Sequence, residues 1–167
     1  MFCYQCEQTA SRTGCAVTGI CGKNPETAAL QDLLVDVAKG ISKYARRAGD
    51  LGATDRDVDV FTIEALFTTV TNVNFDPARM ETILREAATM RDKARENYAA
   101  ACEKAGQEPE ALNGSATWKP ASGLDGLIEQ GNLVGIRKRI ETCGADITGL
   151  EELLVYGLKG VAAYAKH

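Results

Sequence analysis

One stretch sets the fold class of this chain: residues 24–49, NPETAALQDLLVDVAKGISKYARRAG. Asn24 is a favoured N-cap, Pro25 suits the first position of a helix, and Gly49 suits its end. Between them, apolar residues recur at three- and four-residue spacing, which puts them on one face of a helix. The stretch therefore predicts an amphipathic helix whose apolar face carries Leu30, Leu33, Leu34, Val37, Ala38, Ile41, Tyr44, Ala45 and Ala48.

Two more helices are predicted downstream. The second opens at Thr54 or Asp55, with Thr54 and Asp57 in capping-box spacing, and runs to Val70. The third opens with Asp76 as N-cap and Pro77 at its first position, and Gly106 closes it. Short turns join the three helices, so we predict an all-α fold with an up-down-up three-helix bundle over residues 25–106.

The rest of the chain carries weaker signals. Residues 107–147 begin with a stretch rich in Pro, Gly and Ser, and are predicted to be a linker with short helices at 124–131 and 133–141. Thr148 and Glu151 stand in capping-box spacing and predict the start of a last helix over residues 148–167. Trp118, in the linker, is expected to anchor it to the bundle or to contact a further domain.

The last helix repeats the first. Residues 30–45 align without a gap with residues 150–165, and eight of the sixteen positions are identical. Gly40 and Gly160 match mid-helix, where Gly costs roughly 1 kcal/mol relative to Ala, so we expect another backbone to pass close to each. The second copy reaches His167 without a terminator. We therefore expect a fragment, with residues 148–167 as the first helix of a truncated second bundle, and His167 at its surface.

Composition excludes several classes of function. The 167 residues are 45% hydrophobic and carry a formal charge of −4, as expected of one globular domain with a packed core. No basic stripe favours a nucleic-acid partner. No apolar run reaches the roughly 18 residues that span a membrane, and the first residues do not form a secretion signal. We expect a cytoplasmic protein, whose thiols stay reduced.

Four of the six cysteines crowd into residues 1–24: Cys3, Cys6, Cys15 and Cys21. This coil cannot bury enough apolar surface to fold unaided, and four thiolates on a metal centre would order it. A single C-x2-C pair, uneven gaps and no nearby His favour an iron–sulfur cluster over Zn²⁺. The first alternative is a helical interaction module held together by Zn²⁺, and the second is that the four cysteines are free thiols.

The neighbours of these cysteines support the same interpretation. Glycines in the segment would let backbone N–H groups turn towards the sulfurs, and four apolar residues are expected to shield the site. Cys102 and Cys143 are predicted to be small buried hydrophobic residues. The glycines are Gly14, Gly19 and Gly22, and the shielding residues are Phe2, Tyr4, Val17 and Ile20.

The same segment resembles the opening of the hybrid cluster proteins, also called prismane proteins or hydroxylamine reductases. The resemblance rests on MFCYQCEQTA at residues 1–10, then on Gly14-Cys15 and Gly19-Ile20-Cys21-Gly22-Lys23. It continues through residues 30–34, 67–75, 91–93 and 157–165. Relatives of the carbon monoxide dehydrogenase type share the architecture, but the Phe2-Cys3-Tyr4-Gln5-Cys6 pattern argues against that branch.

The resemblance to this family implies a cluster type, further domains, a substrate and an electron donor. Cys3, Cys6, Cys15 and Cys21 would ligate a [4Fe–4S] cluster, since relatives with wider gaps carry [2Fe–2S]. Two three-helix bundles and two α/β domains would make up the whole protein. A hybrid iron–sulfur–oxygen cluster beyond this chain would reduce the small-molecule substrate, hydroxylamine to ammonia or nitric oxide to nitrous oxide. An electron-donor protein, a ferredoxin or a flavin/iron–sulfur reductase, would supply the electrons, and this chain alone would be inactive.

Overall fold

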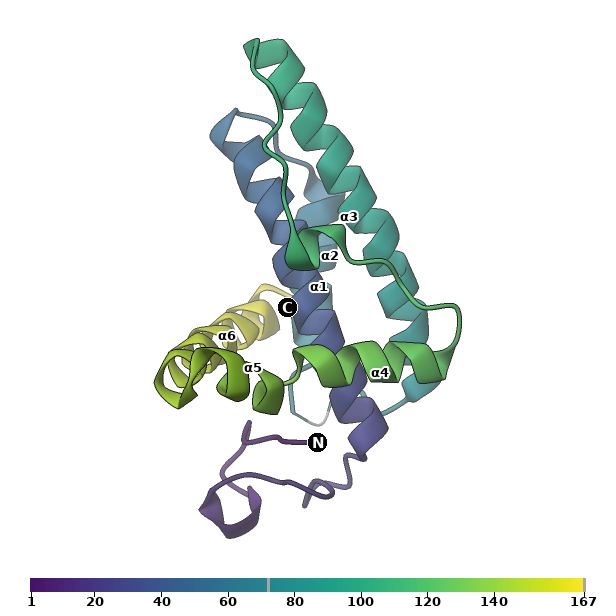
Figure 1. The fold of residues 1–167 in the computed structure, drawn as a ribbon, viewed down its shortest axis with the longest axis vertical. Coiled ribbons are helices and arrows are strands. Elements are labelled where there is room, and N and C mark those ends of the chain that lie inside the picture. Colours follow the sequence, from purple (N-terminus) through teal and green to yellow (C-terminus); the bar gives the residue numbers. More distant parts are fainter. Residues whose placement is uncertain (72, 167) are drawn as a thin grey trace.

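A computed structural model describes residues 1–71 and 73–166, and they fold as an all-α protein (Figure 1). The all-α prediction is confirmed: the described residues contain no β-strand, only an isolated bridge between Cys3 and Cys15. The predicted surface position of His167 lies outside the described residues. The α-helices are α1 (Pro25–Asp50), α2 (Arg56–Thr68), α3 (Pro77–Ala105), α4 (Leu124–Val134), α5 (Ile136–Cys143) and α6 (Ala145–Ala165), with 3-10 turns η1 (Ala10–Arg12) and η2 (Gly114–Thr117).

Side-chain caps begin α1, α2 and α3. Asn24 Oδ1 accepts from Thr27 N at 2.8 Å and Asp76 Oδ1 accepts from Ala78 N at 2.9 Å, so both predicted caps are confirmed. For α2 the cap is Asp55 rather than Thr54, because the Asp55 carboxylate accepts two backbone N–H groups. Gly106 closes α3 with φ 68°, a backbone conformation that Gly adopts without strain.

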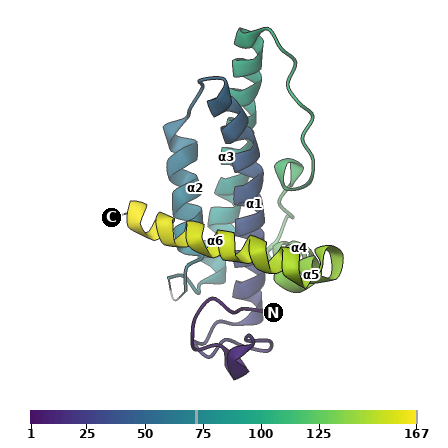
Figure 2. The same ribbon diagram turned by 90° about the vertical axis from the view of Figure 1, so that its left-hand side faces the viewer.

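The core lies mainly between α1, α2 and α3, which run side by side in Figures 1 and 2, and η2 and α4 add Ala116 and Leu127 to it. The apolar face of α1 is buried as predicted, and each fully buried Leu contributes roughly 1.5–3 kcal/mol. α2 ends at Thr68, before the predicted Val70, in a turn where the Thr69 hydroxyl donates to Leu66 O. The largest fully buried core side chains are Leu30, Leu33, Leu34, Ile41, Met80, Leu84, Leu127, Val37 and Val58.

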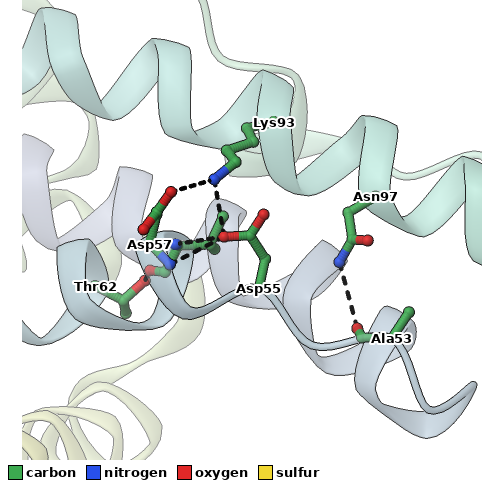
Figure 3. A network of polar contacts seen from close by, with 7 residues as sticks. Ala53, Asp55, Asp57, Thr62, Lys93 and Asn97 are labelled. Carbon is green, nitrogen blue, oxygen red and sulfur yellow. Dashed lines mark hydrogen bonds and ion pairs between the residues drawn. The ribbon is translucent and has the colours of Figure 1, made fainter.

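Polar contacts join the start of α2 to α3 (Figure 3). Lys93 Nζ on α3 lies 2.9 Å from the Asp55 carboxylate and 2.7 Å from that of Asp57. Asn97, one turn further, donates to Ala53 O at 3.3 Å. The hydrogen bond from Lys93 is the largest of the effects that lower the pKa of Asp55, so the capping carboxylate is held in its charged form.

η2 and α4 pack on α1. η2 touches α1 at Gly40, where an added Cβ would lie 2.2 Å from Ser115 O, so the predicted close approach is confirmed there. α4 crosses α1 in the same way, since a Cβ on Gly131 would lie 2.1 Å from Ala29 O. Trp118 packs on the core and donates from Nε1 to Gln130 Oε1 at 3.1 Å, which fixes the segment between η2 and α4.

The beginning of α6 differs from the prediction. The helix starts at Ala145, because Gly144 at φ 85° separates it from α5 without any side-chain cap. Thr148 is therefore not an N-cap but a buried residue inside the helix, and the predicted capping box is wrong. Cys143 is exposed at the end of α5, so its predicted burial is also wrong, whereas Cys102 is fully buried as predicted.

α6 runs crosswise to α1, α2 and α3 in Figure 2 and packs against α2 and α5. Around Gly160 the described residues leave open space, so the close approach expected there is not found. None of the described helices is long and apolar enough to cross a bilayer. The outer side of α6 exposes Ile147, Leu150, Leu153, Leu154, Tyr156, Leu158, Val161 and Tyr164.

Candidate metal centre

The cysteine-rich segment lies at the N-terminal end of α1 (Figures 1 and 2). Cys3 and Cys15 face each other across an antiparallel bridge, with N···O distances of 3.1 and 2.8 Å. Directly opposed residues of this kind have Cβ atoms roughly 4.5–5.5 Å apart on the same side of the ladder. The backbone therefore brings these two predicted ligands together, with Cys15 buried and Cys3 half-buried.

Cys6 and Cys21 occupy separate turns. The Cys6 carbonyl accepts from Thr9 N at 3.3 Å, and Cys21 is exposed within the turn closed by Gly22 N and Gly19 O at 2.9 Å. Within residues 1–71 and 73–166, no three His, Cys, Asp or Glu side chains converge to hold a metal ion. That Cys3, Cys6, Cys15 and Cys21 are four ligands of one centre thus stays a prediction.

A backbone N–H group donates to the Cys15 sulfur. Ala10 N lies 3.5 Å from Cys15 Sγ, and the backbone N–H of Ala10, followed by that of Ile20, lowers the pKa of the thiol. Burial raises the pKa of this thiol, and the positive charge of Lys23 lowers it. The result favours the thiolate, which is the form that binds metals. N–H bonds to cysteine sulfur are also typical of iron–sulfur centres, so the donor chemistry here fits such a cluster.

Two glycines make room inside the segment. An added Cβ would lie 2.6 Å from the Phe2 ring at Gly14 and 3.0 Å from Cys21 Sγ at Gly19. Phe2 also packs edge-on against Tyr4, with ring centroids 5.4 Å apart. Val17 and Ile20 are 80% and 61% exposed, so the prediction that they shield the site is wrong. The loop that carries Val17 and Ile20 points these side chains outward, because Thr18 and Gly19 form hydrogen bonds with the Lys23 carbonyl rather than with the helical bundle.

Lys23 and Gln31 belong to this site and were missed from the sequence. Lys23 is 3% exposed, and its Nζ donates to Gln31 Oε1 at 2.6 Å. Gln31 Nε2 in turn donates to Asn74 O at 2.8 Å, in the loop before α3. One signal was available in the sequence. Gln31 precedes Leu34 by three positions and Ala38 by seven, which puts this polar side chain on the buried face of α1.

A cluster of charged side chains lies where α1, α5 and α6 meet, and Gln5 of the segment lines the same small cavity. Burial raises the pKa of Asp32 to about 7, against the attraction of Lys159, whose own pKa burial lowers to about 8. Arg139 on α5 pairs with Glu152 on α6, and with Glu151 at 3.2 Å. These charged groups connect α5 to α6 and bring Asp32 of α1 close to Lys159 of α6.

Comparison with known proteins gives one consistent result. A sequence model of the Prismane/CO dehydrogenase family matches residues 1–167. A protein of Rhodospirillum rubrum named hydroxylamine reductase is 54% identical over 167 residues, which cover 100% of this chain and 30% of the relative. Proteins of the same name from Burkholderia lata and Geobacter sulfurreducens are 52% and 48% identical over 100% of this chain, which covers 31% and 30% of their lengths.

Proposed function

Because this chain belongs to the Prismane/CO dehydrogenase family, we propose that it is the iron–sulfur electron-transfer part of a hydroxylamine reductase-type oxidoreductase. Membership implies that an iron–sulfur cluster is bound. The chain spans about 30% of the length of the curated relatives it matches, so the activity is proposed for the full-length protein. The substrate we propose is hydroxylamine, reduced to ammonia, with nitric oxide as the second candidate.

The four cysteines of the segment and the backbone beside Cys15 carry the proposed function. Cys3, Cys6, Cys15 and Cys21 hold a [4Fe–4S] cluster, which supplies one-electron transfer when bound. The N–H group of Ala10 stabilises negative charge on the Cys15 sulfur. The observation that carries the proposal is this N–H···S bond at a buried cysteine that the backbone sets opposite Cys3.

The proposed partners follow from this role. An electron-donor protein, a ferredoxin or a flavin/iron–sulfur reductase, delivers single electrons to the centre in the cytoplasm. Substrate reduction belongs to a hybrid iron–sulfur–oxygen cluster in the part of the relatives that this chain does not span. Full-length protein should turn over hydroxylamine, and residues 1–167 alone should not; turnover by the purified chain alone would overturn this division of labour.

Metal and sulfide analysis of anaerobically purified residues 1–167 tests the cluster directly. We expect brown protein with about four iron and four sulfide per chain, and a visible band that bleaches on reduction. Cys15→Ala should lose the iron, while the matched control Cys143→Ala, at an exposed thiol outside the segment, should keep it. Colourless protein with one zinc per chain would support the zinc-stapled module instead, and folded protein without metal would refute both.

A further inference from the structure

Lys23 is a buried cation without a carboxylate partner in the described part of the chain. Lys23 is 3% exposed. Its Nζ donates to the neutral Gln31 Oε1 at 2.6 Å and lies 5.9 Å from the centre of the Phe75 ring. The buried carboxylate of Asp32 on α1 interacts more strongly with Lys159 than with Lys23. A buried charge is costly unless it is paired, so a counter-charge is needed at this position.

The position of Lys23 points to the cysteines as that counter-charge. The Lys23 carbonyl accepts from Gly19 N at 2.8 Å and from Thr18 Oγ1 at 3.1 Å, which fixes its backbone to the turn that carries Cys21. A Cβ added at Gly19 would lie 3.0 Å from Cys21 Sγ and 3.1 Å from Lys23 Cβ, so the side chains of Cys21 and Lys23 leave the backbone next to each other. Lys23 thus lies beside the turn of one predicted ligand, Cys21, and the hydrogen bonds of Gln31 to Lys23 and to Asn74 hold its side chain in place.

We infer that Lys23 is the buried counter-charge of the thiolate-bound cluster and raises its reduction potential. The inference rests on the proposed function, since it requires a cluster. Four thiolates give an oxidised [4Fe–4S]²⁺ centre a net charge of −2, and the electron taken from the donor protein makes it −3. A fixed positive charge nearby stabilises the more negative state, so reduction becomes easier. No proton moves at Lys23, which acts as a positioning residue.

Redox titration of anaerobically purified protein tests this inference. Lys23→Met keeps the volume, Lys23→Gln keeps a hydrogen-bond donor, and Lys23→Arg keeps the charge. Lys43→Met removes the same charge from the far part of α1, where Nζ contacts Asn113 O at 3.3 Å, and is the matched control. Iron and sulfide are measured first, and the potential is then read from the absorbance and EPR signals of the reduced cluster.

We expect the neutral variants to shift the equilibrium about tenfold towards the oxidised cluster, a potential about 59 mV lower. Lys23→Arg and Lys43→Met should stay close to the unmodified protein. Loss of iron from both neutral variants but not from Lys23→Arg also supports the inference, because only Arg retains the charge. Loss of iron from all three, or an unchanged potential in a neutral variant that keeps its iron, overturns it. Absence of iron from unmodified protein instead refutes the proposed function.

Discussion

Substitution of Gly40 by Ala tests whether the segment after α3 is packed on α1 as the structure shows. Gly40 lies in the middle of α1, and an added Cβ would lie 2.2 Å from Ser115 O, 2.5 Å from Ser115 C and 3.0 Å from Ala116 N. All three atoms belong to backbone, which no side-chain rotation can move. The contact is relieved only if η2 moves away from α1, and that exposes Ala116, which is now 1% exposed.

Two opposing effects set the size of the change. Ala at a mid-helix position stabilises the helix by about 1 kcal/mol relative to Gly. Overpacking against atoms that cannot yield typically costs about 1–3 kcal/mol, and a clash with backbone belongs at the upper end of that range. Gly40→Ala should therefore lower the free energy of unfolding by about 2 kcal/mol, which corresponds to about 1 M in the urea midpoint for a domain of this size.

Urea unfolding followed by far-ultraviolet circular dichroism measures this difference. The matched control is Gly49→Ala on the same helix, because a Cβ there meets nothing within 4 Å, and it should leave the protein as stable or more stable by up to about 1 kcal/mol. Gly160→Ala, at the equivalent position of the repeat, should behave like the control. If Gly40→Ala unfolds at the same urea concentration as Gly49→Ala, η2 does not press on α1 and the reasoning fails.

Two further predictions concern charges in the fold. Asp55→Ala removes both the cap of α2 and its link to Lys93 and should cost about 1–2 kcal/mol, whereas Asp57→Ala removes a 75%-exposed partner of the same lysine and should cost less than about 0.5 kcal/mol in the same urea assay. Burial raises the pKa of Asp32 from 3.8 to about 7, so the folded protein keeps a proton that the unfolded chain releases. The free energy of unfolding should therefore fall as pH rises from about 4 to about 7, and Asp32→Asn should flatten this slope; an unchanged slope in urea titrations across that range would contradict the assignment.

Local signals explain why much of the fold was predictable. Asn24, Asp76 and Gly106 act on their own helix ends through one or two hydrogen bonds or a single backbone angle, so the sequence around each is sufficient. Periodicity likewise predicted which face of α1 is buried. The spacing of Cys3, Cys6, Cys15 and Cys21 predicted a candidate site, because ligand type and spacing are themselves sequence features.

What the sequence did not predict depends on partners distant in the chain. Cys143 gave no sign of its exposure, since a lone cysteine says nothing about what packs over it. The start of α6 was misplaced because Gly144, at φ 85°, sets it by backbone conformation and leaves Thr148 inside the helix. Lys23 could not be assigned either, because its burial depends on Gln31 and on Asn74, the latter 43 positions beyond Gln31.

The internal repeat separates what a helix pattern determines from what it does not. Leu30, Leu34 and Tyr44 on α1 are 0%, 0% and 5% exposed, whereas the identical residues Leu150, Leu154 and Tyr164 on α6 are 70%, 65% and 88% exposed. Both copies form helices, so the pattern fixes the backbone and the apolar stripe. Burial of the stripe requires neighbours, and α1 packs against α2, α3, η2 and α4, whereas α6 packs mainly against α2 and α5 among the described elements. That α6 begins a second bundle therefore stays a prediction, since its sequence specifies a face to be covered but not what covers it.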